Sequence, residues 1–466
     1  MRVLFVSSEI YPYAKTGGLA DVSAALPKAL REKGVDVISV MPLFSVVDTA
    51  KHGIKKSTIS FDITLNHHIY HFDVYKKGST YFIANSVLFE RDAMYGSYSD
   101  NGIRFGLFAH AVMELAARLK KPFDVFHLND WQSALVAYLA KTGLKPSPRV
   151  ILTIHNLAFQ GVFKKSCMND LEIGWDAFTM HRFEFYDKVN FLKGAIAYSD
   201  RVIAASPQYA KEIQTPEFGC DLDSFLHGNV HKLSGILNGI DTAEFNPAAD
   251  PFLHKRYRSV TSKGRSENKV YLLEKLGLSH PERPLFIFIG RFAWQKGVGT
   301  ILESIQALAK LHINVAVLGS GEPYYDSSFD ALRGAYPNIS VTLGYDEELA
   351  RMMYASADFM MMPSVYEPCG LNQMIAMAYG CIPIVRATGG LMDSVTDIDD
   401  EYFEDRGCGI VFDKLDRYTF LLAVARAIAL YGEIGLFETL KTRNNRVDNS
   451  WATRADEYIA VYQQRR

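Results

Sequence analysis

Apolar positions recur along the first half of the chain in two alternating patterns. Short continuous runs predict strands at 3–6, 35–41, 124–128 and 150–154. Between them, residues 105–119 keep their apolar side chains on one face at the 3.6-residue spacing of an amphipathic helix. Strands that alternate with helices favour right-handed crossovers and a mostly parallel sheet. The stretch 57–86 instead alternates apolar with polar residues, which predicts antiparallel strands.

A second series of strands begins after the turn-rich and charged stretch 246–284, which breaks the rhythm. Its predicted strands lie at 285–289, 314–318, 339–343, 359–362 and 382–385, with a helix over 298–308. We therefore predict the α/β fold class, with two doubly wound, Rossmann-like domains that face each other across a deep cleft. The expected limits are 1–245 for the first domain, 246–448 for the second, and 449–466 for a last helix that crosses back to the first.

The composition argues against several classes of protein. The 466 residues carry a formal net charge of −2 without a long block of like charges, which argues against nucleic-acid binding and a polybasic membrane anchor. No apolar run approaches the ~18 residues of a membrane span, and the first run is too short for a signal peptide. The five cysteines are scattered without a C-x-x-C pair, so neither a disulfide framework nor a zinc site is indicated. We expect a cytoplasmic protein.

Three basic or glycine-rich loops follow predicted strands, and each suits an anion. They are Lys15-Thr16-Gly17-Gly18, the pair Arg291 and Lys296, and Thr388-Gly389-Gly390. Glycines let backbone N–H groups approach an anion closely, while lysine and arginine supply charge. Alone, the Lys15 loop is equally explained as a tight turn with a solvated lysine, and a surface arginine and lysine such as Arg291 and Lys296 are more often structural. Three such loops in one chain indicate a diphosphate.

Other nucleotide and metal signatures are absent or weak. Neither G-x-G-x-x-G nor G-x-x-x-x-G-K-[ST] follows a predicted strand, so a dehydrogenase and a P-loop nucleotidase are not supported. Asp221-Leu222-Asp223 and Asp397-Ile398-Asp399 match the short D-x-D pattern of metal-dependent sugar transferases. The pattern is common, and Arg291 and Lys296 can stabilise a departing phosphate without a metal. We therefore expect no metal ligands.

Six blocks of sequence, in this order, resemble the bacterial glycogen synthases, which are relatives of the plant starch synthases. The blocks are Lys15–Val22 (KTGGLADV), Thr153–Gly161, Gly235–Asp241, Gly290–Gly297, Pro363–Gln373 and Ala387–Asp393. The resemblance implies the two-domain GT-B architecture and a retaining glycosyltransferase. Its members move glucose from a nucleotide diphosphate sugar, in bacteria mostly ADP-glucose, to the non-reducing end of an α-1,4-glucan such as glycogen. No cofactor is implied, since ADP-glucose is a substrate, and the choice between ADP-glucose and UDP-glucose stays open.

The resemblance also implies roles for individual residues. The catalytic residues would be His155, Glu367, Arg291 and Lys296. The donor would be bound by Lys15, Gly17, Gly18, Asn238, Tyr345, Gly370, Leu371, Thr388, Gly389 and Gly390. The glucose or acceptor side would comprise Asp21, Tyr95, Arg104, Asp130 and Asn156. In this scheme His155 contacts glucose, Glu367 holds glucose hydroxyls or stabilises an oxocarbenium-like centre, and Tyr345 packs on the base.

The sequence departs from the wider pattern at three positions. The superfamily often carries a second glutamate eight residues after the first, where this chain has Ile375. Relatives often carry histidine in place of Asn129 or Gln132. These departures leave the base, ribose and acceptor contacts open.

Three other functions compete with glucan synthesis. A phosphorylase would hold pyridoxal phosphate on a lysine, but its signature is missing. An inactive glucan-binding protein would be expected to lack Lys15, Arg291, Lys296 or Glu367, and all four are present. A sugar-nucleotide epimerase would have no polysaccharide acceptor.

Overall fold

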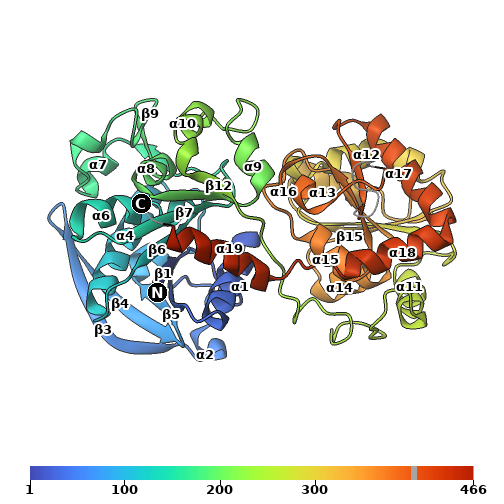
Figure 1. Cartoon of the computed structure of the whole chain (residues 1–466), viewed down its shortest axis with the longest axis horizontal. Helices are drawn as coiled ribbons and strands as arrows, with labels where there is room; N and C mark the ends of the chain where they lie inside the picture. The colour runs from blue at the N-terminus through green and yellow to red at the C-terminus, as the bar shows by residue number, and fades with distance from the viewer. Residues whose placement is uncertain (400–406, 465–466) are drawn as a thin grey trace. The chain divides into compact units, whose positions relative to one another are not determined.

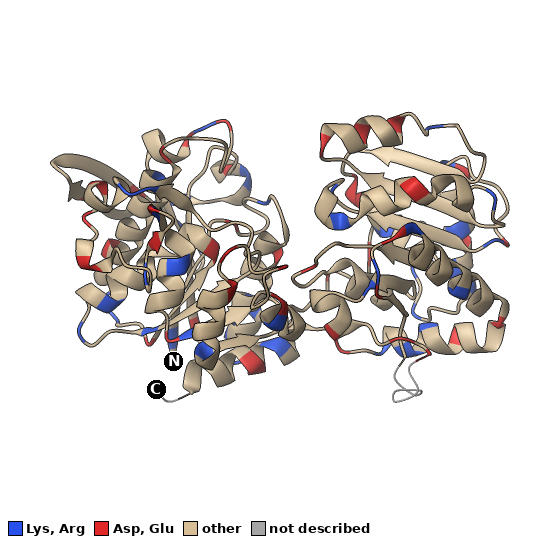
Figure 2. Ribbon diagram, turned by 90° about the horizontal axis from the view of Figure 1, so that it is seen from above, with Lys and Arg blue, Asp and Glu red and all other residues tan. Residues whose placement is uncertain are grey.

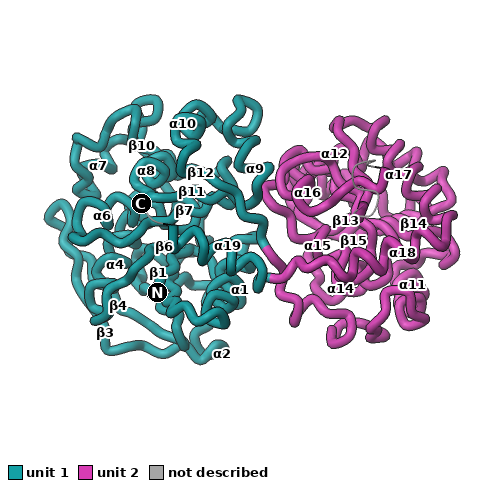
Figure 3. The backbone as a smooth tube through the Cα atoms, viewed as in Figure 1, with its two compact units in different colours: residues 1–238, 451–466 teal, residues 239–450 magenta. Residues whose placement is uncertain are grey.

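The computed structural model describes residues 1–399 and 407–464, and these form two compact units. The first unit comprises residues 1–238 and the segment that begins at Trp451, and the second comprises Gly239–Ser450 (Figure 3). The boundary expected after residue 245 therefore lies after Asn238, because the turn-rich stretch that follows packs within the second unit. The chain returns to the first unit after Ser450, where a boundary after residue 448 was expected.

A nine-stranded sheet runs through the first unit (Figure 1). Its order is β12 (Leu233–Gly235), β11 (Arg201–Ala204), β7 (Arg149–Ile154), β6 (Val125–Asn129), β1 (Arg2–Val6), β2 (Asp36–Pro42), β5 (Thr80–Ala84), β4 (His68–Lys77) and β3 (Lys55–Leu65). The strands from β12 to β5 pair in parallel, whereas β4 pairs antiparallel with both β5 and β3. The antiparallel pairing predicted within 57–86 is thus confirmed.

Helices cover both faces of this sheet. They are α1 (Gly18–Glu32), α2 (Thr49–His52), α3 (Ser86–Phe89), α4 (Asn101–Arg118), α5 (Asp130–Ser133), α6 (Leu135–Gly143), α7 (Cys167–Asp170), α8 (Phe191–Tyr198), α9 (Pro207–Glu212), α10 (Asp223–Gly228) and α19 (Trp451–Gln463). Alternate residues of β1 serve the two faces, since Val3 and Phe5 pack with α1 and α19 while Leu4 and Val6 pack into the larger core opposite. A small sheet of β8 (Val162–Lys164), β10 (Lys188–Asn190) and β9 (Glu184–Phe185) was not predicted.

The second unit contains a six-stranded sheet in which every pair is parallel. Its order is β15 (Ile339–Leu343), β14 (Asn314–Gly319), β13 (Leu285–Ile289), β16 (Phe359–Met362), β17 (Ile382–Arg386) and β18 (Ile410–Phe412). The described helices are α11 (Lys263–Lys275), α12 (Val298–Leu308), α13 (Pro323–Asp330), α14 (Glu347–Ser356), α15 (Asn372–Ala378), α16 (Gly389–Ser394), α17 (Arg417–Gly432) and α18 (Ile434–Asn445). All five strands predicted for this half are present, which confirms the parallel α/β class.

Charged residues of both signs are interspersed over the helices and loops of each unit (Figure 2). Over residues 1–399 and 407–464, no single helix is long and apolar enough to cross a membrane, and α17 and α18 satisfy that test only as a pair bent by 106°.

Candidate functional site

The loop after β1 carries the first predicted anion site. Lys15 points its ammonium at Asp21, with 2.8 Å between Nζ and Oδ1, and 42% of its side chain is exposed. Gly17 and Gly18 begin α1, and a Cβ atom built on either glycine would meet no heavy atom within 4 Å. The start of α1 therefore leaves room beside both glycines for an incoming anion.

A buried carboxylate that the sequence analysis missed shapes this loop. Glu9 is 3% exposed, and its Oε2 accepts the backbone N–H of Thr16 at 2.5 Å and that of Gly17 at 3.4 Å. Its Oε1 accepts the hydroxyls of Thr16 at 2.6 Å and Tyr95 at 2.5 Å. Glu9 thus joins the Lys15 loop to Tyr95, two features predicted to lie on different sides of the reaction.

Asp130 and His155 lie at the carboxyl ends of the neighbouring strands β6 and β7. Asp130 adopts a left-handed backbone with φ of 53°, and its Oδ1 accepts the backbone N–H of His155 at 2.7 Å. Burial raises the pKa of the Asp130 carboxyl to about 7, against the hydrogen bonds that it accepts. A buried acid on such a backbone, at this end of a parallel sheet, is typical of a functional site.

The network around His155 assigns the position of its ring proton. Asn129 donates from Nδ2 to the carbonyl of Val6 at 2.9 Å, so its Oδ1 faces Nε2 of His155 at 3.0 Å. The His155 ring must then carry its proton on Nε2. Burial lowers the pKa of His155 to about 4, which makes it a neutral hydrogen-bonding group rather than an acid at neutral pH.

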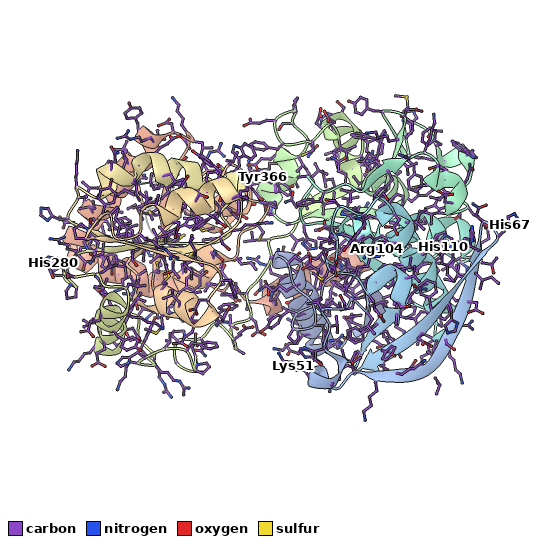
Figure 4. All side chains as sticks on the ribbon, turned by 180° about the vertical axis from the view of Figure 1, so that it is seen from behind. Lys51, His67, Arg104, His110, His280 and Tyr366 are labelled. Carbon is purple, nitrogen blue, oxygen red and sulfur yellow. The ribbon has the colours of Figure 1, made fainter. Side chains whose placement is uncertain are left out.

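Arg104 does not reach a surface where it could contact an acceptor. Its side chain is fully buried and lies inside the first unit (Figure 4). It donates to the carbonyl of Leu88 at 2.6 Å, to Oδ1 of Asn101 at 2.5 Å and to the carbonyl of Met94 at 3.1 Å. Arg104, predicted for the acceptor side, therefore holds the segment that carries Tyr95 through backbone carbonyls and does not present its own side chain at the surface.

Two asparagines of the first unit, Asn238 and Asn156, were also predicted as site residues. Asn238, its last residue before the chain enters the second unit, is 5% exposed, and its buried Oδ1 has no hydrogen-bond partner within residues 1–399 and 407–464. Asn156 follows His155, and its Oδ1 accepts the backbone N–H of Ala158 at 3.0 Å.

In the second unit, the loops after β13 and β16 bring Lys296 and Glu367 together. Nζ of Lys296 lies 2.6 Å from Oε2 of Glu367, which also accepts the hydroxyl of Ser364 at 3.1 Å. Glu367 is 4% exposed, whereas Arg291 is exposed and its side chain makes no ion pair or hydrogen bond to the described residues. Gly297 holds the two loops together, since a Cβ atom there would lie 1.7 Å from the carbonyl oxygen of Pro363.

The glycine-rich start of α16 packs against the same loop. The N–H of Gly390 donates to the carbonyl of Glu367 at 2.9 Å, and a Cβ atom on Gly390 would lie 2.2 Å from the carbonyl oxygen of Cys369. Gln373 ties the loop from the other side by donating from Nε2 to the carbonyl of Gly370 at 3.0 Å and to Ser394 at 2.9 Å. Thr388 and Gly389 lead into this helix, and Leu371 precedes α15. The loops that carry Lys296, Glu367 and Gly390 therefore form one cluster.

Tyr345 stands apart from this hydrogen-bonded cluster. Its side chain is 74% exposed, and its hydroxyl donates to Glu347 at the start of α14. An exposed aromatic ring held by its hydroxyl can stack on a flat ligand.

The two D-x-D matches have other partners or surroundings. Asp397 and Asp399 both accept from Arg426, each with 2.5 Å to Nη2, so an arginine occupies the place of a metal. Asp221 lies in a left-handed turn with φ of 65°, and Asp223 begins α10. Within residues 1–399 and 407–464, no group of three or more histidine, cysteine or carboxylate side chains could hold a metal ion.

Comparison of the sequence with known proteins identifies the family of this chain. Residues 2–228 match the family described as "Starch synthase catalytic domain", and residues 283–428 match "Glycosyl transferases group 1". Glycogen synthase of Aquifex aeolicus is 43% identical over 468 residues, which cover 100% of this chain and 99% of that protein. Glycogen synthase of Myxococcus xanthus is 40% identical, with 99% of each chain covered. The chain belongs to the glycogen synthase family.

Solved structures agree with this assignment. The catalytic domain of starch synthase IV from Arabidopsis thaliana, bound to ADP and acarbose, superimposes with a TM-score of 0.92 at 34% identity, covering 99% of this chain and 98% of that one. A sucrose-phosphate synthase from Thermosynechococcus elongatus shares the fold at a TM-score of 0.63 and 18% identity. The predicted GT-B fold and glycosyltransferase class are confirmed, and membership of the glycogen synthase family assigns the protein to glycogen biosynthesis.

Proposed function

We propose that the protein extends α-1,4-glucans by transferring glucose from ADP-glucose to their non-reducing ends with retention of configuration. The observation that carries this proposal is the Lys296–Glu367 pair at 2.6 Å, which sets a cation and a buried carboxylate side by side. The ADP and acarbose bound to the plant relative support a nucleotide diphosphate donor and a glucan-like acceptor. We further propose a cytoplasmic location and no resident cofactor.

The residues of the two units act on one donor in this proposal. The donor-binding residues are Lys15, Gly17, Gly18, Asn238, Arg291, Lys296, Tyr345, Gly370, Leu371, Thr388, Gly389 and Gly390, and the sugar and acceptor residues are Asp21, Tyr95, Asp130, His155, Asn156 and Glu367. The first unit provides the acceptor side and the second provides most of the nucleotide site. Glu9 is added as a positioning residue, because it holds the Lys15 loop and Tyr95 together.

The negative charge that develops on the leaving phosphate explains the role of Arg291 and Lys296 in this proposal. The bond between the anomeric carbon and the phosphate oxygen breaks with its electron pair on the phosphate. The acceptor hydroxyl forms the new bond on the same face and passes its proton to the departing phosphate oxygen. Arg291 and Lys296 oppose the growing phosphate charge, and fixed cations aimed at such charge supply a large part of catalysis. The Glu367 carboxylate stabilises positive charge at the anomeric carbon. The neutral ring of His155 donates from Nε2 to Asn129 and has Nδ1 available for a sugar hydroxyl.

A glucan-elongation assay with ADP-glucose and UDP-glucose in parallel tests the proposal. Chain growth from ADP-glucose and α-configured products by proton NMR are expected. Glu367→Ala should abolish growth while the protein stays folded by circular dichroism, and Asp397→Asn, at a carboxylate already paired with Arg426, should leave growth intact. Absence of growth with both donors would refute glucan synthesis, and growth from UDP-glucose alone would refute the choice of donor.

A further inference from the structure

The helix α17 has an apolar face that points to solvent in the second unit. Its inner face buries Phe420, Val424, Leu430 and neighbouring alanines in the core. On the opposite face, Tyr418 is 81% exposed and Leu422 is 63% exposed. Ala425, Ala429 and Gly432 continue that face and are exposed as well. A helix that is apolar all round is normally buried on every side, yet nothing within residues 1–399 and 407–464 covers this outer face.

The five residues form one stripe along the helix. Tyr418, Leu422, Ala425, Ala429 and Gly432 are separated by three or four residues, the spacing that places side chains above one another on a helix. No charged residue belongs to the stripe, and Arg426 at its edge is already paired with Asp397 and Asp399. We call these five residues the outer stripe. Leu415 precedes α17 and Ile434 and Leu436 follow it, and these three neighbours are exposed as well.

We propose that the outer stripe is the contact surface between two copies of this chain, with α17 packed antiparallel against its own copy. Ala425 lies at the middle of the stripe, seven residues from Tyr418 and seven from Gly432. With Ala425 on a two-fold axis, the large ring of Tyr418 in one copy lies over Gly432 of the other, twice. A small residue at the axis lets the helices approach closely. Contacts related by a two-fold axis repeat in this way.

The charges at the two ends of the helix favour this antiparallel arrangement. Arg417 begins α17 and is exposed, and Glu433 follows its last residue and is exposed. They lie eight residues on either side of Ala425, so antiparallel pairing brings Arg417 of one copy to Glu433 of the other. Parallel pairing would bring like charges together. A membrane surface would instead favour a rim rich in lysine and arginine, whereas Asp413 and Asp416 accompany Lys414 and Arg417 at one end and Glu433 lies at the other.

The size of the surface indicates a dimer that depends on concentration. Stable interfaces bury about 800 Å² on each partner from 20–30 residues. The outer stripe and its three neighbours are eight residues, well below that number, so only a weak dimer is expected. Light scattering coupled to size-exclusion chromatography should therefore find twice the monomer mass at high protein concentration. The fraction of monomer should increase on dilution.

Two sets of variants test the surface and its register. Tyr418→Glu places a charge on the stripe at a side chain that is already exposed, so the fold is kept and only the monomer is expected. In a Cys220→Ser background, which removes the exposed native cysteine, Ala425→Cys should form a disulfide-linked dimer under mild oxidation. Ala429→Cys is the matched control, because it lies on the same stripe but about 12 Å from its symmetry mate along the helix, too far for a disulfide.

Each outcome decides the proposal. A dimer lost in Tyr418→Glu and cross-linked at residue 425 but not at residue 429 supports it. A wild-type protein that stays monomeric at every concentration overturns it, as does a dimer that Tyr418→Glu leaves intact. Cross-linking at residue 429 alone overturns the register, and sedimentation with anionic phospholipid vesicles in place of self-association would assign the stripe to a membrane.

Discussion

Buried carboxylates hold the candidate loops of both units. Glu9 accepts hydrogen bonds from the N–H and the hydroxyl of Thr16 in the first unit. Glu367 accepts hydrogen bonds from Lys296 and Ser364 in the second. An ionised acceptor forms hydrogen bonds worth about 1.5–3 kcal/mol, more than neutral pairs. The cationic loops are therefore pre-positioned before a donor arrives, which lowers the reorganisation needed during bond cleavage.

Glu9→Gln should weaken donor binding. Glutamine retains one acceptor oxygen, but its NH2 group replaces the other. That group cannot accept the hydrogen bonds that Thr16 and Tyr95 donate to Glu9. We expect the donor KM to rise about tenfold, since loss of roughly 1.4 kcal/mol corresponds to that factor. Tyr95→Phe removes only the phenol contact and should raise the donor KM less. Equal donor KM in wild type and Glu9→Gln, from steady-state kinetics, would contradict a positioning role.

Lys15 and Lys296 should differ in the kinetic constant that they affect. Lys296 pairs with Glu367 beside the expected leaving phosphate, so Lys296→Ala should lower kcat and kcat/KM together by about 10²–10³. Lys15 pairs with Asp21 at an exposed site and is expected to bind the diphosphate equally before and during cleavage. Lys15→Ala should mainly raise the donor KM. A change in KM alone for Lys296→Ala would disprove its assigned role in the transition state.

The Asp130 carboxyl should make stability depend on pH. Its pKa rises from 3.8 to about 7 on folding, so between these values the folded protein keeps a proton that the unfolded chain has released. The free energy of unfolding must then fall as pH rises through that window, by up to about 1.4 kcal/mol per pH unit. Asp130→Asn cannot titrate and should lose this fall. His155, whose pKa is lowered to about 4, makes the free energy of unfolding rise with pH instead. This contribution is present in both the wild type and Asp130→Asn, so it cancels when the two are compared. Urea unfolding at a series of pH values measures the difference, and parallel curves for the two proteins would refute it.

At the scale of elements, apolar periodicity predicted the strands well because a doubly wound sheet buries its strands as continuous runs. It missed α11, whose buried residues include Arg265, Asn268 and Lys269. Their polar groups can be buried because each has a specific partner, as Lys269 has in Asp358 at 2.7 Å. Such pairs leave no apolar pattern in the sequence. Glu9 escaped prediction for the same reason, since its partner Tyr95 is distant in sequence. The burial of Arg104 left no signal in the sequence either, because its partners are backbone carbonyls and Asn101.

Gly297→Ala should damage the catalytic loop of the second unit. The residue has φ of 65°, and its Cβ atom would lie 1.7 Å from the carbonyl of Pro363, so the loops that carry Lys296 and Glu367 must separate. We expect kcat to fall and the free energy of unfolding to drop by about 1–3 kcal/mol. Gly299→Ala is the matched control, because it lies within α12 and its nearest neighbour would be 3.7 Å away. That variant should be neutral or gain stability. Similar kinetics and melting for both variants would show that the loop tolerates the clash.

At the scale of the whole molecule, the chain passes between its compact units twice, after Asn238 and after Ser450. Each unit has its own core, and α19 packs against α1 and the β1 strand within the first unit. His127 at the centre of that unit's sheet is within 2.6 Å of the hydroxyl of Tyr462, which anchors the returning helix. Two covalent connections between separate cores allow rigid-body motion by changes at a few hinge residues.

Donor binding should therefore draw the two units together. The proposed phosphate ligands come from both units, with Lys15 on one and Arg291 and Lys296 on the other, so a bound diphosphate is satisfied only when both reach it. Small-angle X-ray scattering should show a smaller radius of gyration with saturating ADP than without it. Lys15→Ala removes the ligand of the first unit while leaving the nucleotide site of the second, so it should bind ADP yet contract less. An unchanged scattering profile of the wild type with bound ADP would mean that one unit alone holds the diphosphate, and the shared site would have to be abandoned.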